Sequence, residues 1–105
     1  MKISTILKPE AVKVITSATS KKRVLHDLGE MAASVYKINA AAAVEALMER
    51  ETLGPTGVGH GVALPHARIA GLDSVQGAFM LLVKPIHFDA VDRAPVDINF
   101  ARFAP

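Results

Sequence analysis

The residues best suited to chemistry in this 105-residue chain lie between Arg50 and His66. Gly57, Gly59 and Gly61 alternate there with other residues. Such a backbone can turn sharply and expose successive N–H groups, which can form an anion-binding nest. The segment lacks the Gly-Lys-Ser/Thr ending of a nucleotide-binding P-loop and the G-x-G-x-x-G spacing of a dinucleotide-binding turn. The glycines by themselves are therefore only a weak indication of a phosphate site.

His66 strengthens this indication because it comes directly after the stiff apolar segment 62–65. A histidine that accepts a phosphoryl group needs a neutral ring nitrogen facing the donor, and its other nitrogen should be held by a backbone carbonyl. Arg50 and Arg68 are nearby cations that could stabilise phosphoryl oxygens, and Thr56 offers a hydroxyl. These residue types leave two hypotheses open: a phosphoryl-accepting histidine, or a structural histidine at a strand end after a flexible loop.

Two blocks of the chain resemble a known family, the IIA domain of the fructose and nitrogen-regulatory branch of the bacterial phosphotransferase system. The first block resembles its active-site motif through Arg50-Glu51, Gly54, Thr56-Gly57-Val58-Gly59, Gly61-Val62-Ala63 and Pro65-His66. The second block comprises Pro85-Ile86, Phe88-Asp89-Ala90, Asp92, Pro95-Val96-Asp97-Ile98 and Phe100. Two blocks in the right order are far more specific than the glycines alone, and the resemblance covers essentially the whole chain.

The resemblance implies a role for two of the matching residues. His66 corresponds to the phosphorylated histidine of the family, which accepts its phosphoryl group from the phosphocarrier HPr or its nitrogen-branch counterpart. Arg50 corresponds to the arginine beside that phosphohistidine. From the resemblance and the residue types together, we predict that His66 is the catalytic residue and that phosphate is bound by Arg50, Thr56, Gly57, Gly59 and Gly61. We predict no metal and no cofactor.

The sequence leaves three functions open. The first is a nitrogen-regulatory IIA protein, a phosphoryl carrier that binds regulatory targets according to its phosphorylation state. The second is a fructose-type IIA subunit that passes phosphate to a IIB domain and so to an incoming sugar. The third belongs to another class: a non-catalytic anion- or protein-binding module in which the glycine loop holds the phosphate of a ligand and His66 only hydrogen-bonds.

Helical patterns dominate the first half of the chain. Apolar residues recur at spacings of three and four from Ser20, a good N-cap, to about Tyr36. Asn39 predicts the start of a second helix that runs to about Arg50, and Gly54 with the next residue, a proline, predicts its end. Before these helices, residues 3–15 predict a helical turn that is broken by Pro9 and succeeded by a short strand over 11–15.

The second half has the pattern of strands. We predict strands over Val62–Leu64, Gly77–Val83 and Val96–Phe103, and the apolar run 77–83 is typical of a strand covered on both faces. Helices and then strands at this spacing predict an α/β fold, and the resemblance implies the same: a mixed central β-sheet flanked by helices in an α/β/α sandwich.

The domain organisation predicted is a single IIA-type domain over residues 1–105 that is truncated after its last strand. The family domain continues for about a third of its length beyond this point, chiefly in helices, and carries a second active-site histidine there. Arg102 stands where the family pattern has a leucine, on the strand face that holds Ile98 and Phe100. A buried guanidinium without a partner is costly, so we expect Arg102 at the end of the strand or paired with an acid.

Composition excludes several function classes. There are 12 Lys and Arg residues against 10 Asp and Glu residues, without a basic block, so a nucleic-acid partner is not indicated. No cysteine is present, which removes disulfides and thiolate metal sites. The apolar run 79–83 is too short to span a bilayer, and Lys8, Pro9 and Glu10 interrupt any signal-peptide core. We expect a soluble, cytoplasmic protein without membrane insertion.

Other polar residues have simpler interpretations. The spacing of His60 and His66 fits neither one helix nor strict hairpin register, which argues against a metal pair. Asp92, before Arg93-Ala94-Pro95, is typical of a turn. The basic run 21–23 is interpreted as a solvated helix start.

Overall fold

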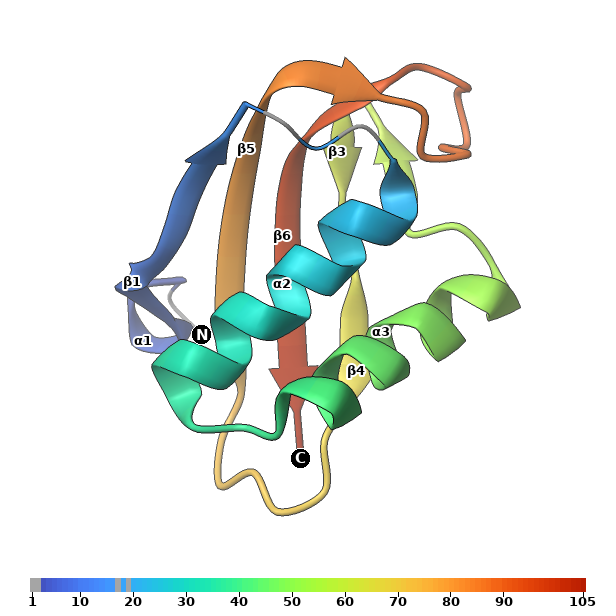
Figure 1. The fold of residues 1–105 in the computed structure, drawn as a ribbon. Coiled ribbons are helices and arrows are strands. Elements are labelled where there is room, and N and C mark those ends of the chain that lie inside the picture. Colours follow the sequence, from blue (N-terminus) through green and yellow to red (C-terminus); the bar gives the residue numbers. More distant parts are fainter. Residues whose placement is uncertain (1–2, 17, 19) are drawn as a thin grey trace.

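The computed structural model describes residues 3–16, 18 and 20–105, and folds them into helices packed on a mixed sheet (Figure 1). The elements in chain order are α1 (Ile3–Ile6), β1 (Leu7–Ile15), α2 (Lys21–Tyr36), α3 (Ala40–Leu53), β2 (Gly57–Gly59), β3 (Val62–Ala63), β4 (His66–Arg68), β5 (Gln76–Ile86) and β6 (Val96–Ala104).

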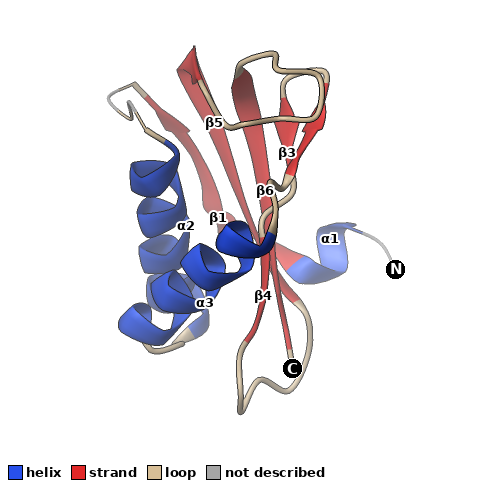
Figure 2. Ribbon diagram, turned by 90° about the vertical axis from the view of Figure 1, so that its right-hand side faces the viewer, coloured by secondary structure: helices blue, strands red, loops and turns tan. Residues whose placement is uncertain are grey.

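The sheet is mixed, as predicted. Its strand order is β1-β5-β6-β3-β2, and β4 also pairs with β6. The β1/β5, β3/β6 and β4/β6 pairs are parallel, whereas β5/β6 and β2/β3 are antiparallel. Figure 2 shows α2 and α3 together on one face of the sheet and α1 on the other. We call these the helix-covered face and the open face.

Both long helices begin where their caps predict. The Oγ of Ser20 accepts a hydrogen bond from the backbone N–H of Arg23 at 3.1 Å, and the Oδ1 of Asn39 accepts one from Ala42 at 2.9 Å. Gly54 caps the end of helix α3, as predicted, but the last helical residue is Leu53 rather than Arg50. Arg50 therefore lies in the last turn of a helix that positions its side chain.

The apolar stripes of the two helices form the core against the helix-covered face. Val24, Leu25 and Leu28 of α2 and Leu47 of α3 are almost completely buried. The helices approach closely at Gly29, where a Cβ atom would lie 2.6 Å from Cγ2 and 2.9 Å from the backbone nitrogen of Val44. Helix packing at this point therefore depends on the absence of a side chain.

The N-terminal prediction is only partly right. The helical turn is present as α1, but β1 begins at Leu7, and Pro9 lies inside the strand rather than before it. β1 is an edge strand, and its pairing with β5 is irregular between Leu7 and Val12. A proline, which lacks an N–H donor, is tolerated at such an irregular edge.

The prediction that residues 77–83 are covered on both faces is wrong. Ala78, Met80 and Leu82 are buried under the helices, but Phe79 and Leu81 are only half-buried and Val83 is 58% exposed. In the described part of the chain, only the short α1 contributes a helix to the open face.

β6 is also oriented differently from its apolar pattern. The Ile98/Phe100 face, which Arg102 continues, is the open face, since Phe100 pairs with Phe79 and Ile98 with Leu81. The face under the helices instead carries Asn99, Ala101 and Phe103, all 0% exposed. Alternation identified the two faces of the strand, but it could not identify the one that the helices cover.

The glycine loop folds into a small β-hairpin made of β2 and β3. His60 and Gly61 form its turn, both with positive φ, and Asp92 holds the turn from outside. The Asp92 carboxylate accepts hydrogen bonds from the backbone N–H groups of His60 and Ala94, both at 3.0 Å, and these bonds lower the pKa of Asp92. The turn role predicted for Asp92 is confirmed, and it extends to the hairpin.

We predict that Gly29→Ala destabilises the fold although alanine favours helices. The helical gain is about 1 kcal/mol, whereas overpacking against the Val44 backbone costs about 1–3 kcal/mol. Urea unfolding should therefore give a lower free energy of unfolding. Ser34→Ala, an exposed position of the same helix, is the matched control and should stay within about 0.5 kcal/mol of the wild type. Equal stability of the two variants would contradict the close packing of α2 and α3.

We predict a pH dependence for Asp92→Asn. Because the folded-state pKa of Asp92 is lowered, its contribution to stability is complete above the ordinary value of 3.8 and is lost as the pH falls through the folded value. The difference in unfolding free energy between wild type and variant should therefore stay constant at neutral pH and shrink below about pH 4. Asp73→Asn, at an exposed loop position, is the control. A difference for Asp92→Asn that does not change with pH would rule out the two backbone hydrogen bonds as its source.

Candidate functional site

His66 has one ring nitrogen on a backbone carbonyl and the other facing an arginine. Its Nδ1 lies 3.2 Å from the carbonyl oxygen of Leu64, and its Nε2 lies 3.0 Å from Nε of Arg50. The arginine Nε always carries a proton, so Nε2 is the acceptor in that contact. Nδ1 then carries the ring proton and donates it to Leu64. The imidazole is thus a neutral tautomer whose Nε2 lone pair accepts the Arg50 Nε–H.

Arg50 reaches this position from the last turn of α3. Its Nη1 donates to the carbonyl oxygen of Gly54 at 2.9 Å, just beyond the helix end. This second hydrogen bond leaves the guanidinium little freedom to rotate away from His66. The end of α3 and its cap residue Gly54 therefore orient the Arg50 guanidinium.

A pocket of about 590 Å³ opens in front of His66 on the open face of the sheet. Most of its lining is apolar and comes from α1, β2, β6 and the segment before β4. The polar groups that reach it include His66, Arg50, Thr56 and Arg102, and no carboxylate of the described residues lines it. An apolar pocket with two guanidinium groups and no such acid favours an anionic ligand.

Behind the pocket lies a buried carboxylate, that of Glu51. It accepts hydrogen bonds from the backbone N–H of Thr56 at 3.0 Å and from its Oγ1 at 2.6 Å. Lys21 completes the arrangement, with its Nζ 3.1 Å from Glu51 and 2.9 Å from Asp89. The two ion pairs of Lys21 therefore tie together α2, α3 and the segment after β5.

Lys21 is a partly buried ion-pair partner rather than part of the solvated helix start predicted for residues 21–23. Burial lowers the pKa of Lys21, but the hydrogen bonds to Asp89 and Glu51 outweigh this effect and raise it. The same contact with Lys21 lowers the pKa of Asp89. The ammonium also lies 5.4 Å from the centre of the Phe88 ring. Only the rest of the run, Lys22 and Arg23, is exposed.

The structure brings some of the predicted site residues together and not others. Arg50 and Thr56 line the same pocket as His66, but Thr56 is only 4% exposed and its hydroxyl directs its proton to Glu51. Gly57, Gly59 and Gly61 do not line the pocket. A phosphate-binding role for Thr56 and the glycines therefore stays a prediction.

The glycines have a packing role that the sequence pattern does not indicate. A Cβ at Gly57 would lie 2.8 Å from Cβ of Ala90, and Gly61 has a φ of 78° that disfavours other residues. The hairpin packs in this way on the segment 88–97, which belongs to the second of the two blocks identified in the sequence.

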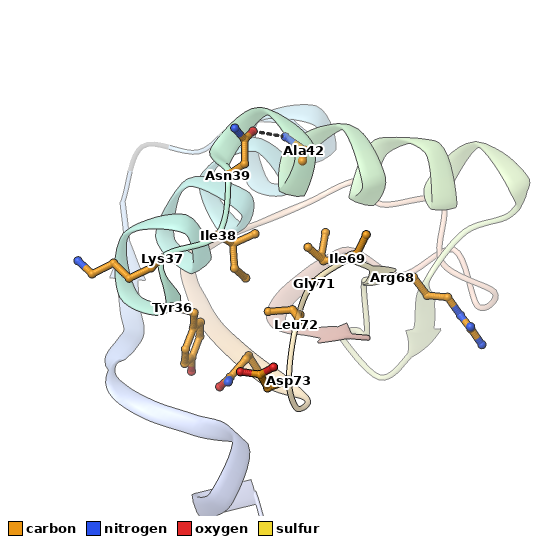
Figure 3. A pocket seen from close by; sticks show the side chains of 12 residues that line it. Tyr36, Lys37, Ile38, Asn39, Ala42, Arg68, Ile69, Gly71, Leu72 and Asp73 are labelled. Carbon is orange, nitrogen blue, oxygen red and sulfur yellow. Dashed lines mark hydrogen bonds between the residues drawn. The ribbon is translucent and has the colours of Figure 1, made fainter.

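The remaining cation of the prediction, Arg68, lies elsewhere. It lines a different pocket, of about 430 Å³, between the α2–α3 connection and the loop after β4. Figure 3 shows that the side chains of Arg68 and Lys37 both point away from this pocket. The two cations on its rim therefore do not converge as Arg50 and His66 do in the first pocket.

The other three histidines lie apart from His66. His60 is in the hairpin turn, His87 lies 2.8 Å from Asp89, and His26 faces Asp27 and Glu30 on the surface of α2. Among the residues that the structure describes, no three His, Asp or Glu side chains group as metal ligands do. The described helices also include none long and apolar enough to cross a membrane.

Two residues of the site have no role predicted from the sequence. Glu51 belongs to the first block, but nothing in the pattern indicates that it is buried and paired. Arg102 lines the pocket beside His66, and its only signal is the alternation of β6, which puts it on the same face as Phe100. Both roles depend on contacts between segments that are distant in the sequence.

Comparison with known proteins identifies relatives of the chain. The chain is similar over its whole length to the nitrogen regulatory protein of Bradyrhizobium diazoefficiens, with 40% identity over 69% of that protein, and to that of Escherichia coli, with 36% identity over 65% of it. It thus spans about two-thirds of the length of these curated relatives.

Solved structures show the same likeness. The crystal structure of the nitrogen regulatory protein IIA-Ntr from Neisseria meningitidis superposes with a TM-score of 0.91 at 37% identity, over 98% of this chain and 70% of that one. IIA mannitol from Escherichia coli shares the fold, with a TM-score of 0.78 at 20% identity over 92% of this chain and 70% of that one. The predicted mixed sheet flanked by helices is thereby confirmed.

The model of one protein family, described as the phosphoenolpyruvate-dependent sugar phosphotransferase system, EIIA 2, matches residues 5–105. This match spans nearly the whole chain and includes both blocks identified in the sequence. The chain belongs to the EIIA 2 family of the phosphoenolpyruvate-dependent sugar phosphotransferase system.

Proposed function

We propose that this chain is a phosphoryl carrier that accepts a phosphoryl group on Nε2 of His66 and acts as a nitrogen-regulatory IIA protein. The observation that carries the proposal is the pair of contacts on the imidazole. Nδ1–H is held by the carbonyl of Leu64, and the lone pair on Nε2 faces the pocket and Arg50. Attack by Nε2 requires this tautomer, in which Nδ1 carries the proton.

The transfer step can be derived from this geometry. The Nε2 lone pair attacks the phosphorus of a phosphohistidine on the donor, a P–N bond forms, and the donor's P–N bond breaks with its electron pair returning to the donor's ring. The Nδ1 proton stays on His66, and the Leu64 carbonyl stabilises the positive charge that develops on the ring. Arg50 must release Nε2 as the phosphorus arrives, and its guanidinium then neutralises the phosphoryl oxygens.

The surroundings favour a phosphohistidine that persists. The pocket walls from Leu64, Val58 and Phe100 are apolar and limit the approach of water once a partner covers them. The donor in this proposal is the phosphocarrier HPr or its nitrogen-branch counterpart, in the cytoplasm. The output is binding to regulatory targets that depends on the phosphorylation state, a role supported by the likeness to nitrogen regulatory proteins.

A second function is favoured by a specific observation. The chain is 32% identical over 98% of its length to a protein named fructose-specific EIIA component in Haloferax volcanii, and it covers 68% of that protein. The alternative is therefore transfer from His66 to a IIB domain for sugar uptake. Mixing the phosphorylated chain with an isolated fructose-type IIB domain distinguishes the two functions. Only a sugar-transport subunit should transfer its phosphoryl group to the IIB domain as fast as sugar is phosphorylated.

We predict that His66→Ala abolishes phosphorylation by phosphoenolpyruvate, enzyme I and HPr, measured by intact mass. Arg50→Gln keeps His66 but removes the cation, and it should slow phosphorylation by about 100-fold. Nitrogen NMR of the phosphorylated chain should place the phosphoryl group on Nε2.

Controls decide between the carrier and the binding module. His60→Asn is the matched control, since asparagine tolerates the positive φ of the turn, and it should be phosphorylated like the wild type. The same assay is run on a version extended by the further third found in the relatives. If the wild type and the extended version are both folded and neither is phosphorylated, the carrier proposal is wrong and the binding module is favoured.

A further inference from the structure

The register of the sheet puts Arg102 directly beside His66. The two residues are Cα partners in the parallel β4/β6 pair. This register is held by hydrogen bonds from the Arg102 N–H to the Pro65 carbonyl at 2.9 Å and from the Ile69 N–H to the Ala104 carbonyl at 2.8 Å. Side chains of directly paired residues project from the same face of a sheet. The guanidinium and the imidazole therefore start from adjacent positions on the open face.

The other neighbours of Arg102 offer it no charge. Across the sheet on β5 its partner is Gly77, which has no side chain, and the Phe100 ring lies 3.2 Å from where a Cβ of Gly77 would be. The residues next to it on the same face of β6 are Phe100 and Ala104. Among the described residues, no carboxylate forms an ion pair with Arg102. Its side chain is exposed and lies near the end of β6, the first of the two placements expected from the sequence. Pairing with an acid, the other placement, is not found among the described residues.

The pocket consequently combines two arginines from separate elements. Arg50 approaches His66 from α3, Arg102 approaches from β6, and no acid of the described chain lines the pocket. In the free protein, Arg50 is the arginine that contacts the ring nitrogen. A phosphoryl group carries charge on several oxygens, and a planar guanidinium can bind two of them at once.

We propose that Arg102 is a second phosphoryl-binding residue of the His66 site, which contacts the oxygens of the phosphohistidine from the side of β6. This inference rests on the proposed function of His66. Arg102 binds the group after transfer, and Arg50 serves both the free ring and the phosphorylated one.

The test uses Arg102→Leu, Arg102→Lys and a matched control, Arg68→Leu. Arg68 lies on β4 two residues from His66 and is exposed, but it is not among the residues that line the His66 pocket. Its loss changes the net charge equally. The first readout is binding of inorganic phosphate to the unphosphorylated chain, monitored by NMR of the His66 ring. The second is the ³¹P resonance of the phosphorylated chain, which gives the pH at which the phosphoryl dianion takes up a proton.

Arg102→Leu should weaken phosphate binding by about fivefold and raise the pH midpoint of the ³¹P titration by about half a unit or more. Arg102→Lys should recover part of both effects, and Arg68→Leu should give less than half of either. If Arg102→Leu and Arg68→Leu change phosphate binding and the ³¹P midpoint equally, Arg102 contributes only to the overall positive charge around the site, and the proposal is overturned.

The two readouts separate the two proposals. If the wild type is never phosphorylated, the proposed function fails, but the phosphate-binding readout still tests Arg102. If the wild type is phosphorylated and Arg102→Leu matches it in both readouts, the inference about Arg102 fails and the proposed function stands. All three variants replace exposed side chains, and circular dichroism verifies their folding.

Discussion

The buried carboxylate of Glu51 is the constraint on which the geometry of the site depends. A carboxylate taken out of water is strongly unfavourable unless donors surround it, and here Thr56 and Lys21 supply three of them. Meeting that demand fixes the end of α3 against the start of the hairpin segment and against the first turn of α2. Arg50 is the preceding residue of the same helix, so the position of its guanidinium is a consequence of the burial of its neighbour.

The two sequence blocks of the family meet at the glycine hairpin. One block supplies the hairpin and His66, and the other supplies the segment that packs against Gly57 and holds the turn through Asp92. The spacing within each block therefore records packing as much as chemistry. This accounts for glycines that are part of the motif and yet lie outside the pocket.

Local signals predicted the parts of the fold that are decided locally. Ser20, Asn39 and Gly54 begin or end helices through contacts within a few residues, so their roles could be predicted from the chain. The covered face of β6 could not, because it depends on which side α2 and α3 pack. β4 could not either, since a strand of three residues is too short to show alternation.

The site divides in the same way. The meeting of His66 and Arg50 at one pocket could be predicted because both belong to the first block identified in the sequence. The tautomer of His66 depends on the Leu64 carbonyl, the burial of Glu51 on Lys21, and the position of Arg102 on the register of β4 against β6. Each of these is a contact in space with no counterpart in local spacing.

Helix α3 also determines which changes in chain length the domain can accept. Arg50 and Glu51 are adjacent residues that project about 100° apart around the same helix end, Arg50 towards the pocket and Glu51 towards the interior. Inserting or deleting a single residue after the Asn39 cap rotates the rest of the helix by about 100°, which would exchange a buried carboxylate for another side chain and move the arginine off His66. The loop 70–75 is mostly exposed, and a change in its length rotates no helix. Variation in length among related chains should therefore be excluded from α3 and accumulate in that loop.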